Sequence, residues 1–83
     1  MNYYRVFSLK ISFDTEPPEW LVSEVGAYTS DKLPTIVIRH TSDMNREMAL
    51  HRALNNLRQL KRETISVIPI ENGTQYLIVT KPE

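Results

Sequence analysis

The chain has 83 residues, with ten Lys and Arg residues balanced by ten Asp and Glu residues and no cysteine. This length predicts one domain over residues 1–83, and the lack of cysteine excludes a disulfide or a thiolate metal site. A formal charge of zero argues against a dedicated nucleic-acid or membrane-surface binder. No signal-peptide pattern is present, and no apolar run approaches the roughly 20 residues that span a bilayer. We therefore expect a cytoplasmic protein.

The first predicted element is a strand over residues 3–13. Its side chains alternate, with apolar residues on one face and polar residues on the other, as in a strand with one buried face. The apolar face comprises Phe7, Leu9, Ile11 and Phe13. We expect both phenylalanines to lie in the core.

A short helix is predicted over residues 18–25. Pro18 suits a first helical turn, and Glu19 places negative charge near the positive end of the helix dipole. Gly26 is a suitable end, because glycine adopts the left-handed conformation without strain. Three apolar side chains share one face at helical spacing: Trp20, Leu21 and Val25.

A strand and a long helix follow. The β-branched run Ile36-Val37-Ile38 predicts a strand over residues 35–40. Ser42 can cap the next helix, which we predict over residues 44–62. Its apolar residues recur at spacings of three and four and form one stripe: Met48, Leu50, Ala53, Leu54, Leu57 and Leu60.

Two further strands, 65–70 and 74–80, are predicted to form a hairpin around Asn72-Gly73. This turn pairs Pro69 with Tyr76, and because proline has no N–H we place Pro69 at a sheet edge or a bulge. The predicted order is strand, helix, strand, helix, strand, strand (β-α-β-α-β-β). This order favours an α+β two-layer sandwich, with a four-stranded, mostly antiparallel sheet and both helices on one face.

The sequence contains no catalytic or cofactor-binding motif. Gly-x-Ser-x-Gly, a glycine-rich phosphate loop and His-Glu-x-x-His are all absent, so we expect no enzyme activity and no cofactor. His40 and His51 are interpreted as surface or boundary residues. Glu47 lies four residues before His51, but two ligands do not make a closed metal site.

Cations are concentrated in residues 39–62, which hold six Lys or Arg residues and two acidic residues. One interpretation is a surface for an acidic protein partner or phosphate, formed by Arg46, Arg52, Arg58 and Arg62. The other, which we favour, is a solvated helix face. A nucleic-acid-binding role ranks lower, because the aromatic motif of RNA-recognition modules is missing.

Several short motifs follow one another in residues 34–71: Ile36-Val37-Ile38, His40-Thr41-Ser42, Ala49-Leu50, Ala53-Leu54 and Ser66-Val67-Ile68. In this order they resemble the second half of ACT domains, above all the C-terminal regulatory domain of homoserine dehydrogenases. The resemblance implies a ferredoxin-like fold and a regulatory module that senses an amino acid. It also implies a homodimer, joined edge to edge or helix to helix.

The same resemblance implies a ligand-binding turn between the first strand and the first helix. The family's Asp-x-Pro-Gly-x-Leu pattern is matched by Asp14, Pro18 and Leu21, while Glu19 stands where the family has glycine. The implied ligand-binding residues are Asp14, Pro18, Glu19, Trp20 and Leu21. The alternative function is a protein–protein interaction module that uses the Arg-rich helix 43–62 or a sheet edge.

Overall fold

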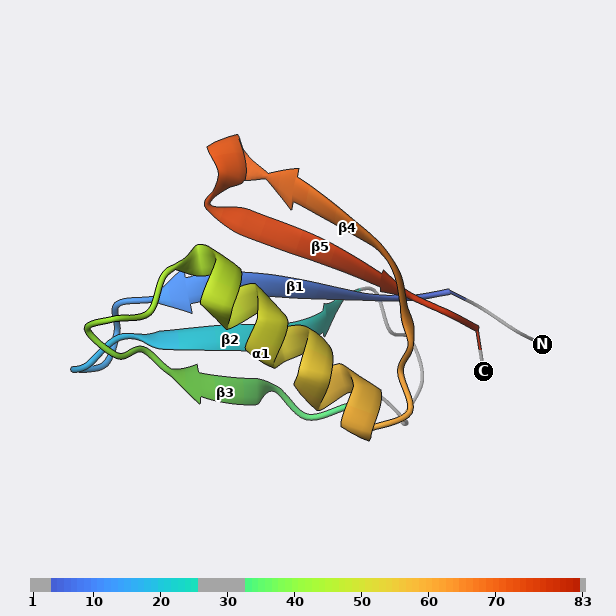
Figure 1. The fold of residues 1–83 in the computed structure, drawn as a ribbon, viewed down its shortest axis with the longest axis horizontal. Helices are drawn as coiled ribbons and strands as arrows, with labels where there is room; N and C mark the ends of the chain where they lie inside the picture. Colours follow the sequence, from blue (N-terminus) through green and yellow to red (C-terminus); the bar gives the residue numbers. More distant parts are fainter. Residues whose placement is uncertain (1–3, 26–32, 83) are drawn as a thin grey trace.

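A computed structural model describes residues 4–25 and 33–82 of the chain. Over these residues the chain forms one five-stranded antiparallel sheet in the order β3-β2-β1-β5-β4, and helix α1 lies across one of its faces (Figure 1). The elements are β1 (Arg5–Ser12), β2 (Glu19–Val25), β3 (Ile36–Arg39), α1 (Arg46–Gln59), β4 (Thr64–Ile70), the 3₁₀ turn η1 (Glu71–Gly73) and β5 (Gln75–Thr80).

The helix predicted over residues 18–25 is wrong, because this segment forms strand β2. Trp20, Val22 and Glu24 alternate along β2 and are all buried towards α1. This spacing of two is the period of a strand, and tryptophan and valine fit a half-buried strand well. The two prolines therefore lie in a hairpin loop between β1 and β2, which pair antiparallel.

The predicted two-layer sandwich of four strands and two helices, in the order β-α-β-α-β-β, is wrong for the same reason. The observed order is β-β-β-α-β-β, a small α+β fold with five strands and one helix in the described part of the chain. The other predicted elements are present, with ends that shift by a few residues. Residues 3 and 26, which two of the predictions include, lie outside the described residues.

Helix α1 is shorter than the predicted span of residues 44–62, and its N-cap is Asn45 rather than Ser42. The Met48 amide donates to Asn45 Oδ1 at 2.9 Å, which satisfies one free amide of the first turn. The helix ends where Lys61 adopts a left-handed φ of 63°. The Arg62 amide then donates to the Leu57 carbonyl at 2.8 Å, the bond that defines a Schellman cap.

The β4–β5 hairpin confirms the predictions for its turn and its proline. Pro69 pairs with Tyr76, and β4 is an edge strand of the sheet. Three successive turn residues have positive φ: Glu71 at 52°, Asn72 at 57° and Gly73 at 81°. A register shift between Thr64 and Ser66 adds an irregularity to the same edge strand.

The core lies between α1 and the covered face of the sheet. Ala49, Ala53 and Leu57 form the buried stripe of the helix, and the two alanines let the helix backbone approach the sheet closely. The expected core role of Phe13 is wrong, because this side chain follows β1 into the hairpin loop and is 74% exposed. The full buried set is Phe7, Leu9, Trp20, Val22, Ile38, Met44, Ala49, Ala53, Leu57 and Ile78.

No helix in residues 4–25 and 33–82 is long and apolar enough to cross a membrane.

Candidate functional site

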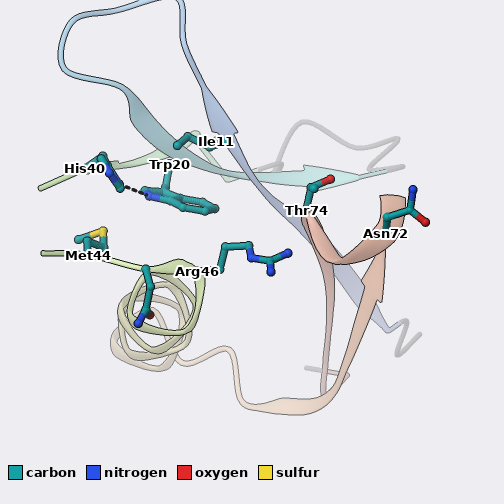
Figure 2. A pocket seen from close by; sticks show the side chains of 8 residues that line it. Ile11, Trp20, His40, Met44, Arg46, Asn72 and Thr74 are labelled. Atoms are coloured by element: carbon teal, nitrogen blue, oxygen red, sulfur yellow. Dashed lines mark hydrogen bonds between the residues drawn. The ribbon is translucent and has the colours of Figure 1, made fainter. Parts of the chain in front are cut away.

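A hollow of about 590 Å³ opens at the N-terminal end of α1. We call it the Trp20 hollow, and Figure 2 shows the side chains around it. Its size falls within the range of roughly 300–1,000 Å³ that is usual for small-molecule sites. The lining residues are Ile11, Trp20, His40, Met44, Asn45, Arg46, Asn72 and Thr74.

Three parts of the chain bring the floor of the hollow together. Ile11 and Trp20 are cross-strand partners in β1 and β2, so their side chains lie on the same face of the sheet. His40 directly follows β3, and its amide donates to the Pro18 carbonyl at 3.0 Å. Met44 is buried just before the helix and completes an apolar floor with Ile11 and Trp20.

A hydrogen bond between two side chains fixes the ring of His40. The indole Nε1–H of Trp20 donates to Nδ1 of His40 at 3.1 Å, and the ring centroids lie 6.3 Å apart. Because the indole nitrogen can only donate, Nδ1 must be the unprotonated nitrogen of the imidazole. The ring proton then lies on Nε2, which makes His40 an N–H donor of fixed orientation at the hollow.

Arg46 forms the cationic part of the rim. It is the first residue of α1, and its Nη1 donates to the Gly73 carbonyl, so the start of the helix is tied to the β4–β5 turn. A Cβ at position 73 would lie 3.1 Å from Arg46 Nη1, and the φ of +81° also favours glycine there. A guanidinium carries five N–H donors, so one bond to Gly73 leaves others that can meet a ligand.

Two groups at this end of the helix attract an anion. The free amides of the first turn carry positive partial charge, and the Arg46 guanidinium adds a full charge. Asp43 and Glu47 are close in sequence but do not line the hollow. The hydroxyl of Thr41 donates to Asp43 at 2.7 Å and holds the pKa of that carboxyl below its ordinary value.

A second polar cluster lies at the opposite end of α1, around Glu24. Arg5 donates to both carboxylate oxygens of Glu24, at 2.5 Å and 2.6 Å, and the Leu33 amide donates to one of them at 3.1 Å. The hydrogen bond from Arg5 holds the pKa of Glu24 below its ordinary value, and the charge of Arg62 acts in the same direction. Glu24 is only 6% exposed, so we interpret this cluster as a structural ion pair.

The five residues that the resemblance implied as ligand-binding do not form one site. Trp20 lines the hollow, but Leu21 is its neighbour in a strand and points to the opposite face of the sheet. Glu19 shares the face of Leu21, and Asp14 is exposed in the β1–β2 loop, where its amide donates to Ser12 Oγ at 3.3 Å. Pro18 contributes only its carbonyl, which binds the His40 amide.

The four arginines proposed for an acidic partner are also separated. Arg46 belongs to the Trp20 hollow, while Arg52 and Arg58 lie exposed along the helix. Arg62 is only 7% exposed, because the chain turns back towards the sheet after the helix cap. The four side chains therefore do not make a single cationic surface.

Sequence reasoning missed His40, Asn45 and Asn72 as parts of a site. A usable indication was present for His40, because a buried tryptophan needs an acceptor for its N–H and the chain has only two histidines. His51 is exposed on α1. Over residues 4–25 and 33–82, no group of three or more His, Cys, Asp or Glu side chains is placed to hold a metal ion.

No protein-family model matches the chain, and no curated protein or solved structure shows significant similarity to it. The resemblance to ACT domains therefore stays a prediction, but the ferredoxin-like fold that it implied is wrong, because the described residues form five strands and one helix in the order β-β-β-α-β-β.

Proposed function

We propose that this chain is a non-catalytic binding module that takes a small carboxylate with an apolar side chain, such as an amino acid, in the Trp20 hollow. One observation carries the proposal. A single hollow combines an apolar floor of Ile11, Trp20 and Met44 with the guanidinium of Arg46 on its rim. Small-molecule sites typically combine an apolar lining with a few polar groups that fix orientation.

The lining suggests how such a ligand would be held. The carboxylate would accept from Arg46 and lie near the positive end of α1, because charge-assisted bonds to a guanidinium are among the strongest in proteins. The apolar side chain would pack on Trp20 and Ile11. The Nε2–H of His40 can donate a further hydrogen bond, and Asn72 and Thr74 offer oxygen atoms that can accept from an ammonium group.

The single tryptophan of the chain makes the test direct, since Trp20 itself lines the hollow. We expect at least one of the twenty amino acids, titrated at millimolar concentration, to change the Trp20 emission in a saturable way. The same amino acid should raise the melting temperature, because a ligand that binds only the folded state stabilises it. The proposal is overturned if no amino acid and no related carboxylate changes the emission.

A matched pair of variants tests the role of the rim. Arg46→Gln should weaken binding by about tenfold or more, because it removes a charge-assisted hydrogen bond to the carboxylate. Arg52→Gln removes the same charge from an exposed position on the same helix, outside the lining residues. It should leave the affinity unchanged. Equal losses in both variants would show that net charge, and not the hollow, controls binding.

A further inference from the structure

The face of the sheet opposite α1 is rich in apolar side chains. Helix α1 covers one face of the sheet (Figure 1). Phe7, Trp20 and Ile78 are buried on that face, so the alternate residues of each strand point the other way. No other described element lies over this second face, which we call the open face. Its apolar residues are Val6, Leu21, Val25, Val37, Ile68, Ile70, Leu77 and Val79.

The strand register arranges four strands of the open face in three rows. The first row runs Val25, Val6, Val79 and Ser66 from β2 to β4. The second row runs Ser23, Ser8, Leu77 and Ile68, and the third runs Leu21, Lys10, Gln75 and Ile70. In the second row, the two side chains on β2 and β1 are small and the two on β5 and β4 are large.

We propose that a second copy of this chain packs on the open face, with a two-fold axis that runs along the strands between β1 and β5. This axis places β1 on β5 of the second copy and β2 on its β4. Each row then lies directly opposite the same row of the second copy. Large side chains then meet small ones across the interface: Leu77 opposite Ser8, Ile68 opposite Ser23, and Val25 opposite Ser66. A two-fold interface requires this kind of self-complementarity.

The other pairs of side chains that face each other in this arrangement are also compatible with a packed interface. Val6 meets Val79, and Leu21 meets Ile70, so apolar groups face apolar groups. Lys10 meets the amide of Gln75, which can accept a hydrogen bond from the ammonium group. The third row, at the end of the interface, contains Lys10 of both copies, and their long side chains can carry the ammonium groups out to solvent. Sheets that pack in this aligned way keep their strands within about 30° of one another and about 10 Å apart.

The area of the open face suits a small dimer. Four strands spaced about 4.8 Å apart, over three rows of side chains, give a footprint of about 400 Å² per copy. Two copies together then bury about 800 Å², which corresponds to a weak dimer that forms and dissociates with concentration. The sheet edges are less suitable, because β3 has four residues and β4 carries Pro69 and a register shift.

Sedimentation equilibrium of the full chain tests the proposal with two matched variants. Ile68 and Val37 are both exposed, at 44% and 53%, and both lie in edge strands on the open face. Only Ile68 lies inside the proposed interface. Ile68→Lys should raise the dimer dissociation constant about 100-fold or more, because each dimer would bury two ammonium groups, whereas Val37→Lys should leave it unchanged. A monomeric wild-type chain, or equal effects of the two variants, overturns the proposal.

Cysteine cross-linking provides a second readout that does not depend on a destabilising change. The chain has no cysteine of its own, so single cysteines can be introduced at chosen positions. Chains with Ser23→Cys mixed with chains with Ile68→Cys should be joined by a short bismaleimide cross-linker, because sheets packed about 10 Å apart are too distant for a direct disulfide. Ser23→Cys mixed with Val37→Cys should not. Equal yields in the two mixtures overturn the arrangement, and neither result depends on a ligand in the Trp20 hollow.

Discussion

The two ends of strand β2 each bury a polar side-chain group, but they satisfy its hydrogen bonds with different kinds of partner. Trp20 lies near the start of α1 and Glu24 near its end, and both carry polar groups into the buried face of the sheet. Trp20 meets the neutral ring of His40, while Glu24 meets the cation of Arg5. The neutral pair leaves a hollow beside it, and the charged pair is enclosed. A buried charge must be surrounded by its partners, whereas a buried N–H needs only one acceptor.

Removal of Glu24 should have the largest effect on stability. Glu24→Ala removes the buried carboxylate that accepts two hydrogen bonds from Arg5 and one from the Leu33 amide, and the loss of one partner of a buried ion pair typically costs about 3–5 kcal/mol. We expect the free energy of unfolding, measured by urea denaturation, to fall by about this amount. Glu63→Ala is the control, because Glu63 pairs with Lys81 at 3.7 Å in an exposed position and such pairs contribute about 0–1 kcal/mol.

The same pair predicts a pH dependence. Arg5 holds the pKa of Glu24 below its ordinary value of 4.5, so between the two pKa values the unfolded chain binds more protons than the folded chain. The stability that the pair provides is therefore complete above that ordinary value and is lost as the pH falls through the lower, folded-state value. Glu24→Gln should flatten this part of the stability curve. An unchanged acid limb in the variant would contradict the assignment to Glu24.

The hydrogen bond between Trp20 and His40 should contribute less to stability than the ion pair of Glu24 and Arg5. Trp20→Phe keeps an aromatic ring in the core but removes the N–H that the half-buried His40 ring accepts, and the loss of one such hydrogen bond typically costs about 0.5–1.5 kcal/mol. Circular dichroism during urea denaturation measures the loss, since the variant has no tryptophan. A double-mutant cycle with His40→Leu should give a coupling energy of about 0.5–1.5 kcal/mol. Strict additivity would show that the bond contributes nothing.

The smallest expected effect is a gain in the free energy of unfolding, from a substitution at the C-terminal end of α1. Lys61 holds a left-handed φ of 63°, a conformation that costs a side-chain-bearing residue roughly 1 kcal/mol more than glycine. Lys61→Gly should therefore raise the free energy of unfolding by up to about 1 kcal/mol. Asn55→Gly, at an exposed position inside α1, should lower it by about 0.3–0.5 kcal/mol, because glycine is a poorer helix former than asparagine. A loss of stability in both variants would contradict the role of the cap.

The sequence predicted those parts of the fold whose patterns are local and consistent. The alternation around Phe7 and Leu9, the stripe of Ala49, Ala53 and Leu57, and the Asn72-Gly73 turn each point to one structure. Strand β2 was misread because Pro18 and Glu19 resemble a helix start and because Glu24, counted as polar, hides the alternation with Trp20 and Val22. Only the burial of Glu24 against Arg5, 19 residues away, restores the strand pattern.

The candidate site was harder to predict, because its residues meet only in the tertiary structure. Trp20 and Arg46 were both identified, but in different roles and in different predicted sites. Arg46 reaches the hollow because it is the first residue of a helix capped by Asn45, and it reaches Gly73 across 27 positions of sequence. Neither contact leaves a periodic pattern that a single sequence can show.

The pairing of β1 with β5 has a consequence for how the chain folds. Arg5 pairs with Thr80, and the Thr80 hydroxyl donates to the Arg5 carbonyl at 3.0 Å across 75 positions of sequence. The central strand of the sheet thus receives its second neighbour only after the 75 positions that separate the two residues have been synthesised. Such distant contacts slow folding and leave strand edges open in the meantime. During synthesis on the ribosome, one edge of β1 therefore stays unpaired until β5 has emerged.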